Sequence, residues 1–299
     1  LLSTADLALH AAKAAGRGLF KFSSKAQRIQ RERQRTTLEQ LKRGLAKQEL
    51  LVHFQPQVDV SAKRVIGMEA LLRWDHPERG TLAPIHFLDL AMDNGLGDEL
   101  TSICIQQSIE ALKNWRDLAI DVPRVSLNFA ANQLRNPGLI DELNQRVCDS
   151  GLSSRDISIE IVESVLFGDR EDRAISQVKR LRDLGYKIEL DDFGTGHASI
   201  SNLTRFKVDR IKLDRMFVSD IDSNKDKHTI VSALTDLAGK LDIECLAEGV
   251  ETPSERDELL SLGCTQFQGY LFSRPQSQPA ITLWLLHRNS IEVSSNQAV

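Results

Sequence analysis

The feature that most constrains the fold of this chain is an eightfold alternation of short apolar runs with longer amphipathic segments, which begins near residue 51. Short apolar runs between polar turns predict strands, and apolar residues spaced three to four apart predict helices. The predicted strands are His53–Val58, Val65–Leu72, Val125–Phe129, Ile157–Val162, Lys187–Leu190, Val208–Leu213, Ile243–Ala247 and Thr265–Gln268. The predicted helices include Gly97–Leu118, Gly138–Ser150, Arg170–Leu184, Lys225–Leu241 and Ser254–Leu262.

Eight strand-and-helix units within about 240 residues are typical of an α/β protein with a TIM (β/α)8 barrel. A doubly wound open sheet is the alternative fold, and the polar residues at the strand ends count against it. With 299 residues, the chain can hold one domain of roughly 250 residues and a short extension, or two ordinary domains.

Composition excludes several classes of protein. The formal net charge of −4 gives no broad basic field for polymeric nucleic acid or for an anionic membrane. There is no apolar run of 18 residues and no signal-peptide pattern, so we expect a cytoplasmic domain without membrane contact. Because the first residue is Leu1 rather than Met, we expect a fragment of a longer protein. Whether that longer protein is anchored in a membrane is left open by this sequence. The four cysteines form no CxxC pair and are expected to be reduced: Cys104, Cys148, Cys245 and Cys264.

Acidic or amide side chains stand at or near the ends of five predicted strands, and a lysine ends a sixth. Barrel active sites are built at the C-terminal ends of the strands, so these side chains should share one cavity. Like charges crowded there are costly unless cations neutralise them, and all-oxygen ligands suit Mg²⁺ or Mn²⁺ better than zinc. Taken singly, Glu160 would more often be a structural ion-pair partner than a ligand, and Asn128 alone would more often be a turn residue at a strand end. The set consists of Glu69, Asn128, Glu160, Asp191, Asp192, Glu248 and the lysine Lys212.

The motifs around these residues resemble, in this order, those of the EAL-domain family of cyclic di-GMP phosphodiesterases, over about residues 37–290. They are Phe54-Gln55-Pro56, Glu69-Ala70-Leu71-Leu72-Arg73-Trp74, Ser126-Leu127-Asn128, Glu160-Ile161-Val162-Glu163-Ser164, Asp191-Asp192-Phe193-Gly194-Thr195-Gly196, Asp209-Arg210-Ile211-Lys212-Leu213-Asp214, Ala247-Glu248-Gly249-Val250-Glu251-Thr252 and Gln268-Gly269-Tyr270-Leu271-Phe272. The resemblance implies a modified TIM barrel in which one strand runs antiparallel to the others.

The resemblance also implies a role for each matching residue. Ligands of a first metal ion would be Glu69, Asn128, Glu160 and Asp191, and Asp192 and Glu248 would join a second ion. Lys212 is similar to an essential lysine that positions the attacking water and stabilises phosphoryl charge. Glu251 is similar to a residue that anchors the Asp192–Ser199 loop. Contacts to the dinucleotide would come from Gln55, Leu72, Arg73, Gln268 and Arg274.

The implied reaction is hydrolysis of cyclic di-GMP to linear pGpG by water that two Mg²⁺ or Mn²⁺ ions activate. Ca²⁺ should inhibit, because it is larger and its coordination geometry is looser. The general base is either Glu248 or Lys212. A catalytically silent cyclic di-GMP receptor is the alternative function, and a phosphodiesterase for another nucleotide is a weaker one. Receptors of this family typically lose metal ligands or the lysine, and here all are present.

Residues 1–24 resemble the C-terminal helix of a GGDEF (diguanylate cyclase-like) domain, with an ordinary Ala-rich helix as the alternative. We therefore predict a GGDEF remnant at 1–24, a linker helix at 25–36, the EAL domain at 37–290 and a tail at 291–299. The full-length protein would then carry an upstream GGDEF domain, with or without a sensory domain. The resemblance further implies a homodimer formed through the region after Asp191-Asp192-Phe193-Gly194. His197 stands there in place of the family's usual Tyr.

The two-residue period of a strand leads to one further expectation. Glu189 shares a face with Asp191, and Arg210 shares one with Lys212. We therefore expect a buried Glu189–Arg210 ion pair beneath the metal site. The alternative is a bulge that turns one of the two side chains outward.

Overall fold

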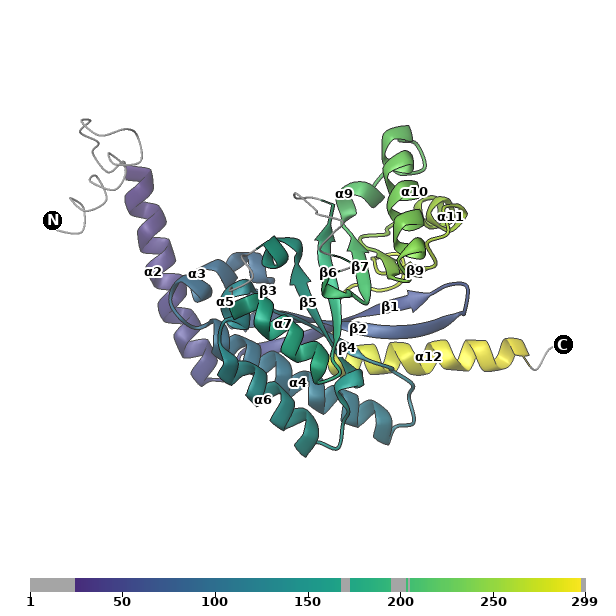
Figure 1. Ribbon diagram of the computed structural model, residues 1–299. Coiled ribbons are helices and arrows are strands. Elements are labelled where there is room, and N and C mark those ends of the chain that lie inside the picture. The colour runs from purple at the N-terminus through teal and green to yellow at the C-terminus, as the bar shows by residue number, and fades with distance from the viewer. Residues whose placement is uncertain (1–24, 168–172, 195–202, 204, 297–299) are drawn as a thin grey trace, which may run out of the picture. The chain divides into compact units, whose positions relative to one another are not determined.

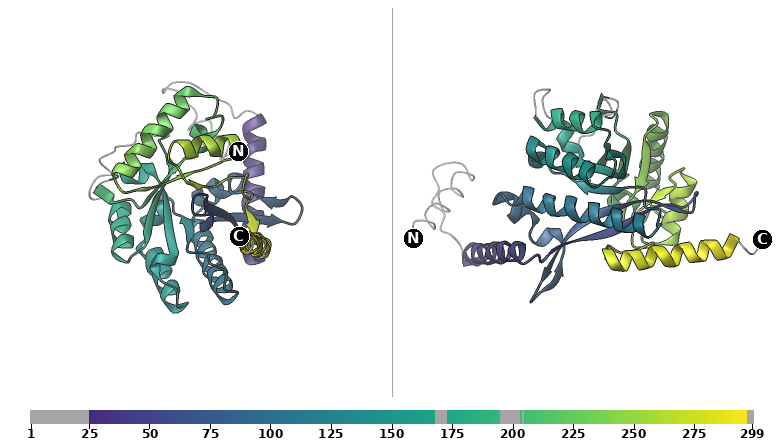
Figure 2. Two further views of the ribbon diagram at one scale, coloured as in Figure 1. Left: turned by 90° about the vertical axis from the view of Figure 1, so that its right-hand side faces the viewer. Right: turned by 90° about the horizontal axis from the view of Figure 1, so that it is seen from below.

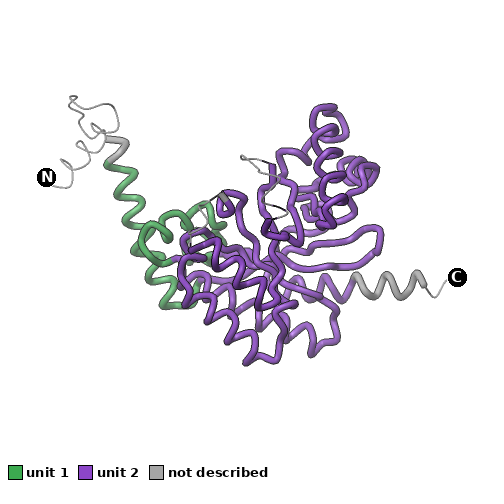
Figure 3. The backbone as a smooth tube through the Cα atoms, viewed as in Figure 1, with its two compact units in different colours: residues 1–49, 74–96 green, residues 50–73, 97–299 purple. Residues whose placement is uncertain are grey.

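The computed structural model describes residues 25–167, 173–194, 203 and 205–296 of the chain (Figure 1). The chain divides into two compact units, one made of residues 1–49 and 74–96 and the other of residues 50–73 and 97–299 (Figure 3). Each unit has its own packed side chains. The predicted GGDEF remnant at 1–24 lies outside the described residues and stays a prediction.

The second unit is a closed barrel of eight strands. Neighbouring strands are parallel from β2 round to β9, whereas β1 runs antiparallel to β9. The pairing of β1 with β2 closes the ring, so the open-sheet alternative is wrong and the modified TIM barrel is confirmed. The strands are β1 (Leu50–Asp59), β2 (Arg64–His76), β4 (Val125–Asn128), β5 (Ile157–Val162), β6 (Lys187–Phe193), β7 (Arg210–Leu213), β8 (Glu244–Ala247) and β9 (Gln266–Phe267).

All eight predicted strands are present, and two short ones were missed. β3 (Gly80–Leu82) pairs with the end of β2 in the first unit, and β10 (Gln276–Ser277) pairs with β1. Strands of two or three residues are too short to show an alternating pattern. Their pairing depends on the partner strand rather than on their own sequence.

The helices of the second unit lie outside the strands (Figure 2). Five match predicted helices: α4 (Gly97–Asp117), α6 (Pro137–Asp149), α7 (Arg173–Asp183), α10 (Lys225–Lys240) and α11 (Pro253–Ser261). Of these helices, α6, α10 and α11 begin at a capping side chain. The Asn136 side chain accepts from Gly138 N, and Thr252 and Glu255 form a capping box.

Several shorter elements and one long helix were not predicted. The long helix, α12, begins directly after β10, and its first turns contact α4, where Trp115 Nε1 donates to Thr282 Oγ1 at 2.8 Å. The unpredicted elements of the second unit are α5 (Ala131–Leu134), α9 (Arg215–Val218), α12 (Gln278–Asn296), η2 (Ser154–Asp156) and η3 (Glu163–Phe167).

The first unit contains α2 (Lys25–Ala46), β3, η1 (Pro84–His86) and α3 (Leu88–Asp93). Trp74 is its buried centre: its ring packs edge-on against Phe87 at 5.7 Å, and its Nε1 donates to Glu49 Oε2 at 3.2 Å. The predicted boundary between residues 36 and 37 falls inside α2, which runs through it without a break.

Two expectations about the chain as a whole can be compared with the structure. All four cysteines are free thiols. Among the described residues, no helix is both long and apolar enough to cross a membrane.

Candidate active site

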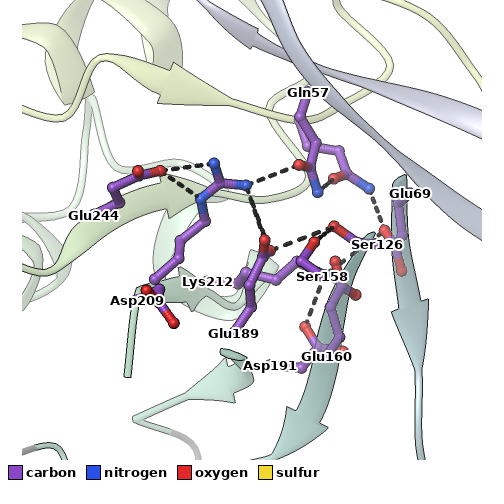
Figure 4. Close-up of polar contacts among 12 residues, drawn as sticks. Gln57, Glu69, Ser126, Ser158, Glu160, Glu189, Asp191, Asp209, Lys212 and Glu244 are labelled. Atoms are coloured by element: carbon purple, nitrogen blue, oxygen red, sulfur yellow. Dashed lines mark hydrogen bonds and ion pairs between the residues drawn. The ribbon is translucent and has the colours of Figure 1, made fainter. Parts of the chain in front are cut away.

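The predicted site residues lie at one end of the barrel, because the parallel register carries the same edge of each strand to the same rim. Asn128 at the end of β4 is level with Glu160 on β5, and Val162 on β5 is level with Asp191 on β6. Glu69 lies on β2, Lys212 on β7, and Glu248 directly follows β8. The structure therefore brings together side chains that the sequence placed on separate strands. Figure 4 shows four of them: Glu69, Glu160, Asp191 and Lys212.

Lys212 is the centre of this rim. Its ammonium lies 2.6 Å from Glu160 Oε2, 2.6 Å from Glu248 Oε1, 3.1 Å from Asp191 Oδ1 and 3.7 Å from Glu69 Oε2. The lysine itself is fully buried. We call these five residues the rim cluster; it contains four carboxylates and one ammonium.

The imbalance of charge shows in the pKa values of the rim cluster. Burial raises the pKa of Glu160 well above its ordinary value, and Glu69 adds to the effect while Lys212 opposes it. Burial likewise raises the pKa of Glu248 to about 8, with Lys212 opposing and Asp191 adding to the rise. For Lys212, burial would lower the pKa, but Glu160 and Glu248 outweigh it and raise the pKa well above its ordinary value. The lysine therefore stays protonated while the carboxyls compete for too little positive charge.

A bulge in β6 gives the adjacent acids Asp191 and Asp192 a common direction. Successive residues of a regular strand face opposite sides. Here the register with β7 shifts between Leu190 and Phe193, and Asp192 takes a positive φ of 52°. As a result, oxygens of Asp191, Asp192 and Glu248 all lie within 4.8 Å of one another. Burial raises the pKa of Asp192 to about 6, and Asp191 adds to that rise.

The donor set fits a hard divalent cation. It consists of carboxylate oxygens and one amide, the ligands that Mg²⁺ and Mn²⁺ prefer. Glu160 Oε1 is buried and, within the described part of the chain, accepts no hydrogen bond. Buried polar atoms are normally satisfied, so this oxygen marks a place where a cation would be stabilised. Asn128 Nδ2 donates to Glu69 Oε1 at 2.9 Å, which orients the two predicted ligands toward each other.

The five predicted dinucleotide contacts have different surroundings. Gln55 and Gln268 adjoin the rim cluster: Gln268 Nε2 donates to Glu69 Oε2 and, at 3.1 Å, to Gln55 Oε1. Arg73 is held by its own neighbour, with Nη1 donating to Leu72 O at 2.8 Å, and burial lowers its pKa. Arg274 stacks on the Tyr270 ring at 4.2 Å. The Leu72 side chain is buried, and its contact to a dinucleotide stays a prediction.

The loop after Asp192 is contacted by a residue to which the sequence analysis gave no role. Glu163 Oε2 accepts from Gly194 N at 3.4 Å, and the other oxygen of Glu163 is buried without a hydrogen bond in the described residues. Glu251 instead pairs with Arg215 at 2.9 Å. Residues 195–202 lie outside the described part, so the anchoring role predicted for Glu251 stays a prediction, as does any role of His197. The position of Glu163, three residues after Glu160 at a strand end, was the available signal.

A second polar group lies one layer below the rim. Arg210 Nη1 is 3.4 Å from Glu189 Oε2, and both side chains are buried, which confirms the predicted ion pair and rules out the outward bulge. The pair is not the closest contact of Arg210, however. Its Nη2 and Nε donate to Glu244 Oε2 at 2.7 and 3.1 Å, and its Nη1 donates to Gln57 Oε1 at 2.9 Å (Figure 4). We call Glu189, Arg210, Glu244 and Gln57 the lower layer.

Comparison with known proteins gives consistent matches. The family model described as EAL domain matches residues 38–275. The chain is 35% identical over 285 residues to the "Cyclic di-GMP phosphodiesterase NbdA" of Pseudomonas aeruginosa, covering 95% of this chain and 36% of that protein. It is 34% identical over 285 residues to the "Cyclic di-GMP phosphodiesterase PdeR" of Escherichia coli, covering 95% of this chain and 42% of that protein. The chain thus spans well under half the length of these curated relatives.

A solved structure agrees in fold. The structure described as "PaMucR Phosphodiesterase, c-di-GMP complex" superimposes with a TM-score of 0.78 at 32% sequence identity. The match covers 82% of this chain and 99% of that one. The similarity therefore includes nearly the whole of the solved domain.

Proposed function

Because this chain belongs to the EAL domain family, we propose that it hydrolyses one phosphodiester bond of cyclic di-GMP and releases linear pGpG. The observation that carries the proposal is the rim cluster, where the buried ammonium of Lys212 lies 2.6 Å from both Glu160 and Glu248. A buried lysine among four carboxylates is expensive to build for packing alone. Strongly perturbed groups of this kind, gathered at a barrel rim, are typical of an active site.

The residues of the rim suit two divalent ions, Mg²⁺ or Mn²⁺. Glu69, Asn128, Glu160 and Asp191 would hold one ion, and Asp192 and Glu248 would hold the other. When bound, such ions supply positive charge to phosphoryl oxygens and make a water molecule more acidic.

Lys212 and Glu248 can be given separate tasks. The raised pKa of Lys212 keeps its amine protonated, so it acts as a fixed positive charge and hydrogen-bond donor rather than as a base. It would orient the attacking water and stabilise charge on the phosphoryl group. Glu248 is a carboxylate whose Oε1 lies 2.6 Å from the Lys212 ammonium, and an ionised carboxylate can accept a proton from that water. We therefore assign the general base to Glu248.

The guanidinium and amide groups beside the rim suit the dinucleotide. Arg73 and Arg274 offer positive charge, and Gln55 and Gln268 offer donors and acceptors next to Glu69. Planar guanidinium groups match phosphate oxygens and stack on bases. We propose that these four residues orient the substrate over the rim cluster.

Chromatography of cyclic di-GMP after incubation with the chain and Mg²⁺ tests the proposal. We expect conversion to pGpG, and no conversion when EDTA removes the metal. A Glu69→Gln variant serves as the matched control, because it keeps the size of the side chain and removes one ligand charge. Binding of intact cyclic di-GMP without any hydrolysis would support the receptor alternative instead.

We further propose that the chain forms a symmetric homodimer through the region after Gly194. Closed twofold assemblies are the commonest oligomers of soluble proteins. Sedimentation at tens of micromolar, an order-of-magnitude concentration suited to weak interfaces, should show a dimer. A purely monomeric boundary at that concentration would contradict this part of the proposal.

A further inference from the structure

A line of hydrogen bonds joins the lower layer to the rim cluster. Arg210 Nη1 donates to Gln57 Oε1 at 2.9 Å, and Gln57 Nε2 donates to Gln268 Oε1 at 3.1 Å. Gln268 Nε2 in turn donates to Glu69 Oε2 (Figure 4). The line crosses the barrel interior, since Gln57, Gln268 and Arg210 are all buried.

This line has a direction that its first member sets. A guanidinium donates hydrogen bonds and accepts none, whereas a glutamine amide can be turned either way round. Arg210 therefore requires the oxygen of Gln57 to face it, which turns the Gln57 NH₂ toward Gln268. That NH₂ requires the oxygen of Gln268, and only then does the NH₂ of Gln268 face Glu69 and Gln55.

The guanidinium is itself fixed in orientation. Glu244 Oε2 accepts from both Nε and Nη2 of Arg210, which holds one edge of the planar group. Glu189 lies 3.4 Å from Nη1 on the other side and balances the charge. The remaining direction of Nη1 is the one that meets Gln57.

The opposite amide orientation would be unfavourable at the rim. A reversed Gln268 would point its carbonyl oxygen at the carboxylate of Glu69, and it would face the Gln55 oxygen as well. Two acceptors at hydrogen-bond distance repel each other, and the buried carboxylate would lose a donor. Glu69 would then keep the amide of Asn128 as a donor, bound to its other oxygen.

We propose that Arg210 and Gln57 are positioning residues, which set the amide orientation of Gln268 and so hold Glu69 for metal binding. The proposal rests on the proposed function in one respect, namely that Glu69 is a metal ligand. The competing explanation is a network that only stabilises the barrel. The two explanations differ in whether loss of Gln57 acts through Gln268.

Isothermal titration calorimetry of the metal-free chain with Mn²⁺ alone tests whether Gln57 and Arg210 affect metal binding at the rim cluster. We expect Gln57→Met to weaken Mn²⁺ binding roughly tenfold to a hundredfold, the usual effect of removing a group that orients a metal ligand. Arg210→Lys keeps the positive charge but loses the planar guanidinium with its several fixed donors. It should therefore also weaken Mn²⁺ binding. The control is Gln107→Met, which removes a partly buried amide that bridges Val52 N and Leu50 O.

A double-mutant cycle separates positioning from general stability. If Gln57 acts through Gln268, adding Gln57→Met to Gln268→Met should cause no further loss of Mn²⁺ affinity. Additive losses in the double variant would overturn the proposal. So would an equal loss of affinity in Gln107→Met.

The side-chain NH₂ signals in an NMR spectrum of ¹⁵N-glutamine-labelled chain provide a readout that needs neither metal nor substrate. The Gln268 pair is identified by its disappearance in Gln268→Met. We expect it to shift in Gln57→Met and Arg210→Lys and to stay in place in Gln107→Met. An unshifted pair in both test variants would overturn the proposal. If the parent chain bound no Mn²⁺, the proposed function would fail, and these signals would still decide whether Arg210 sets the amide.

Discussion

The two ends of strand β8 carry the same residue type in opposite surroundings. Glu244 begins the strand in the lower layer, where burial would raise its pKa but Arg210 and Arg124 outweigh it and lower the pKa. Glu248 follows the strand in the rim cluster, where burial and Asp191 raise the pKa to about 8 despite Lys212. One carboxylate has its counter-charges, and the other shares a single ammonium with three more acids. The lower layer is thus built for stability and orientation, and the rim holds unfavourable charge of the kind found at functional sites.

The largest effect is expected from the loss of Lys212 in the rim cluster, and the affected quantity should be the rate of hydrolysis. We expect Lys212→Ala to reduce hydrolysis of cyclic di-GMP roughly 10²–10³-fold, because it removes a group that stabilises transition-state charge. Initial rates at saturating Mg²⁺ measure the loss. A Lys212→Ala variant that hydrolyses cyclic di-GMP as fast as the parent would contradict the role of the rim cluster.

Loss of Glu189 should have its main effect on stability. Removing one partner of a buried ion pair costs roughly 3–5 kcal/mol. We expect the low end of that range for Glu189→Ala, because Arg210 keeps Glu244. Urea denaturation of the metal-free chain measures the free energy of unfolding. A variant that unfolds like the parent would show that the lower layer does not support the barrel.

Replacing Mg²⁺ by Ca²⁺ probes the geometry of the rim without changing a residue. Ca²⁺ takes more ligands at longer distances, so it should bind the same oxygens and place the water and phosphate poorly. We expect the rate of hydrolysis to fall at least about tenfold, with Ca²⁺ competing against Mg²⁺. Equal rates with the two ions would contradict the two-metal proposal.

Replacing the glutamate at each end of β8 directly tests the difference between the lower layer and the rim cluster, in metal-free buffer with EDTA. Glu248→Gln should stabilise the fold by about 1 kcal/mol, as removal of an unfavourable functional charge often does. Glu244→Gln should destabilise it by a similar amount, since Arg210 loses its closest carboxylate. Urea denaturation of both variants at neutral pH compares them.

The pH dependence of the Glu248→Gln effect has a defined sign. The folded pKa of about 8 lies above the ordinary value of 4.5, so the folded parent binds the proton more tightly than the unfolded chain. Stability of the parent is therefore lost as pH rises from about 4.5 to about 8. The gain from Glu248→Gln should be small near pH 4.5 and grow up to pH 8. A gain that shrinks over this interval would contradict the assignment.

The smallest effect is expected at the exposed pair of Arg35 and Glu39 on α2, which lie 3.1 Å apart. Exposed pairs at this helical spacing contribute about 0.3–0.5 kcal/mol, and the order with the base first is the weaker one. Arg35→Ala should therefore change the free energy of unfolding by less than about 0.5 kcal/mol. A larger change would mean that Arg35 makes stabilising contacts beyond its pair with Glu39.

Much of the fold could be predicted because it depends on local patterns. Each of the eight barrel strands is a short apolar run with the right flanking turns, and five helices show the apolar spacing that packs against them. The elements that were missed depend on partners elsewhere in the chain. β10 is a strand because β1 offers it an edge, and two residues carry no pattern of their own.

At the site, the sequence determined which side chains are present and at which strand ends, since the two-residue period and the parallel order bring Glu69, Glu160 and Lys212 to one rim. It also predicted the buried Glu189–Arg210 pair from the same period. The tertiary structure alone decided how charge and hydrogen bonds are shared across the barrel. Arg210 prefers Glu244 and Gln57 to Glu189, and a bulge turns Asp191 and Asp192 to the same side. Those choices depend on distances between strands far apart in the chain, and the spacing of residues along one strand does not contain them.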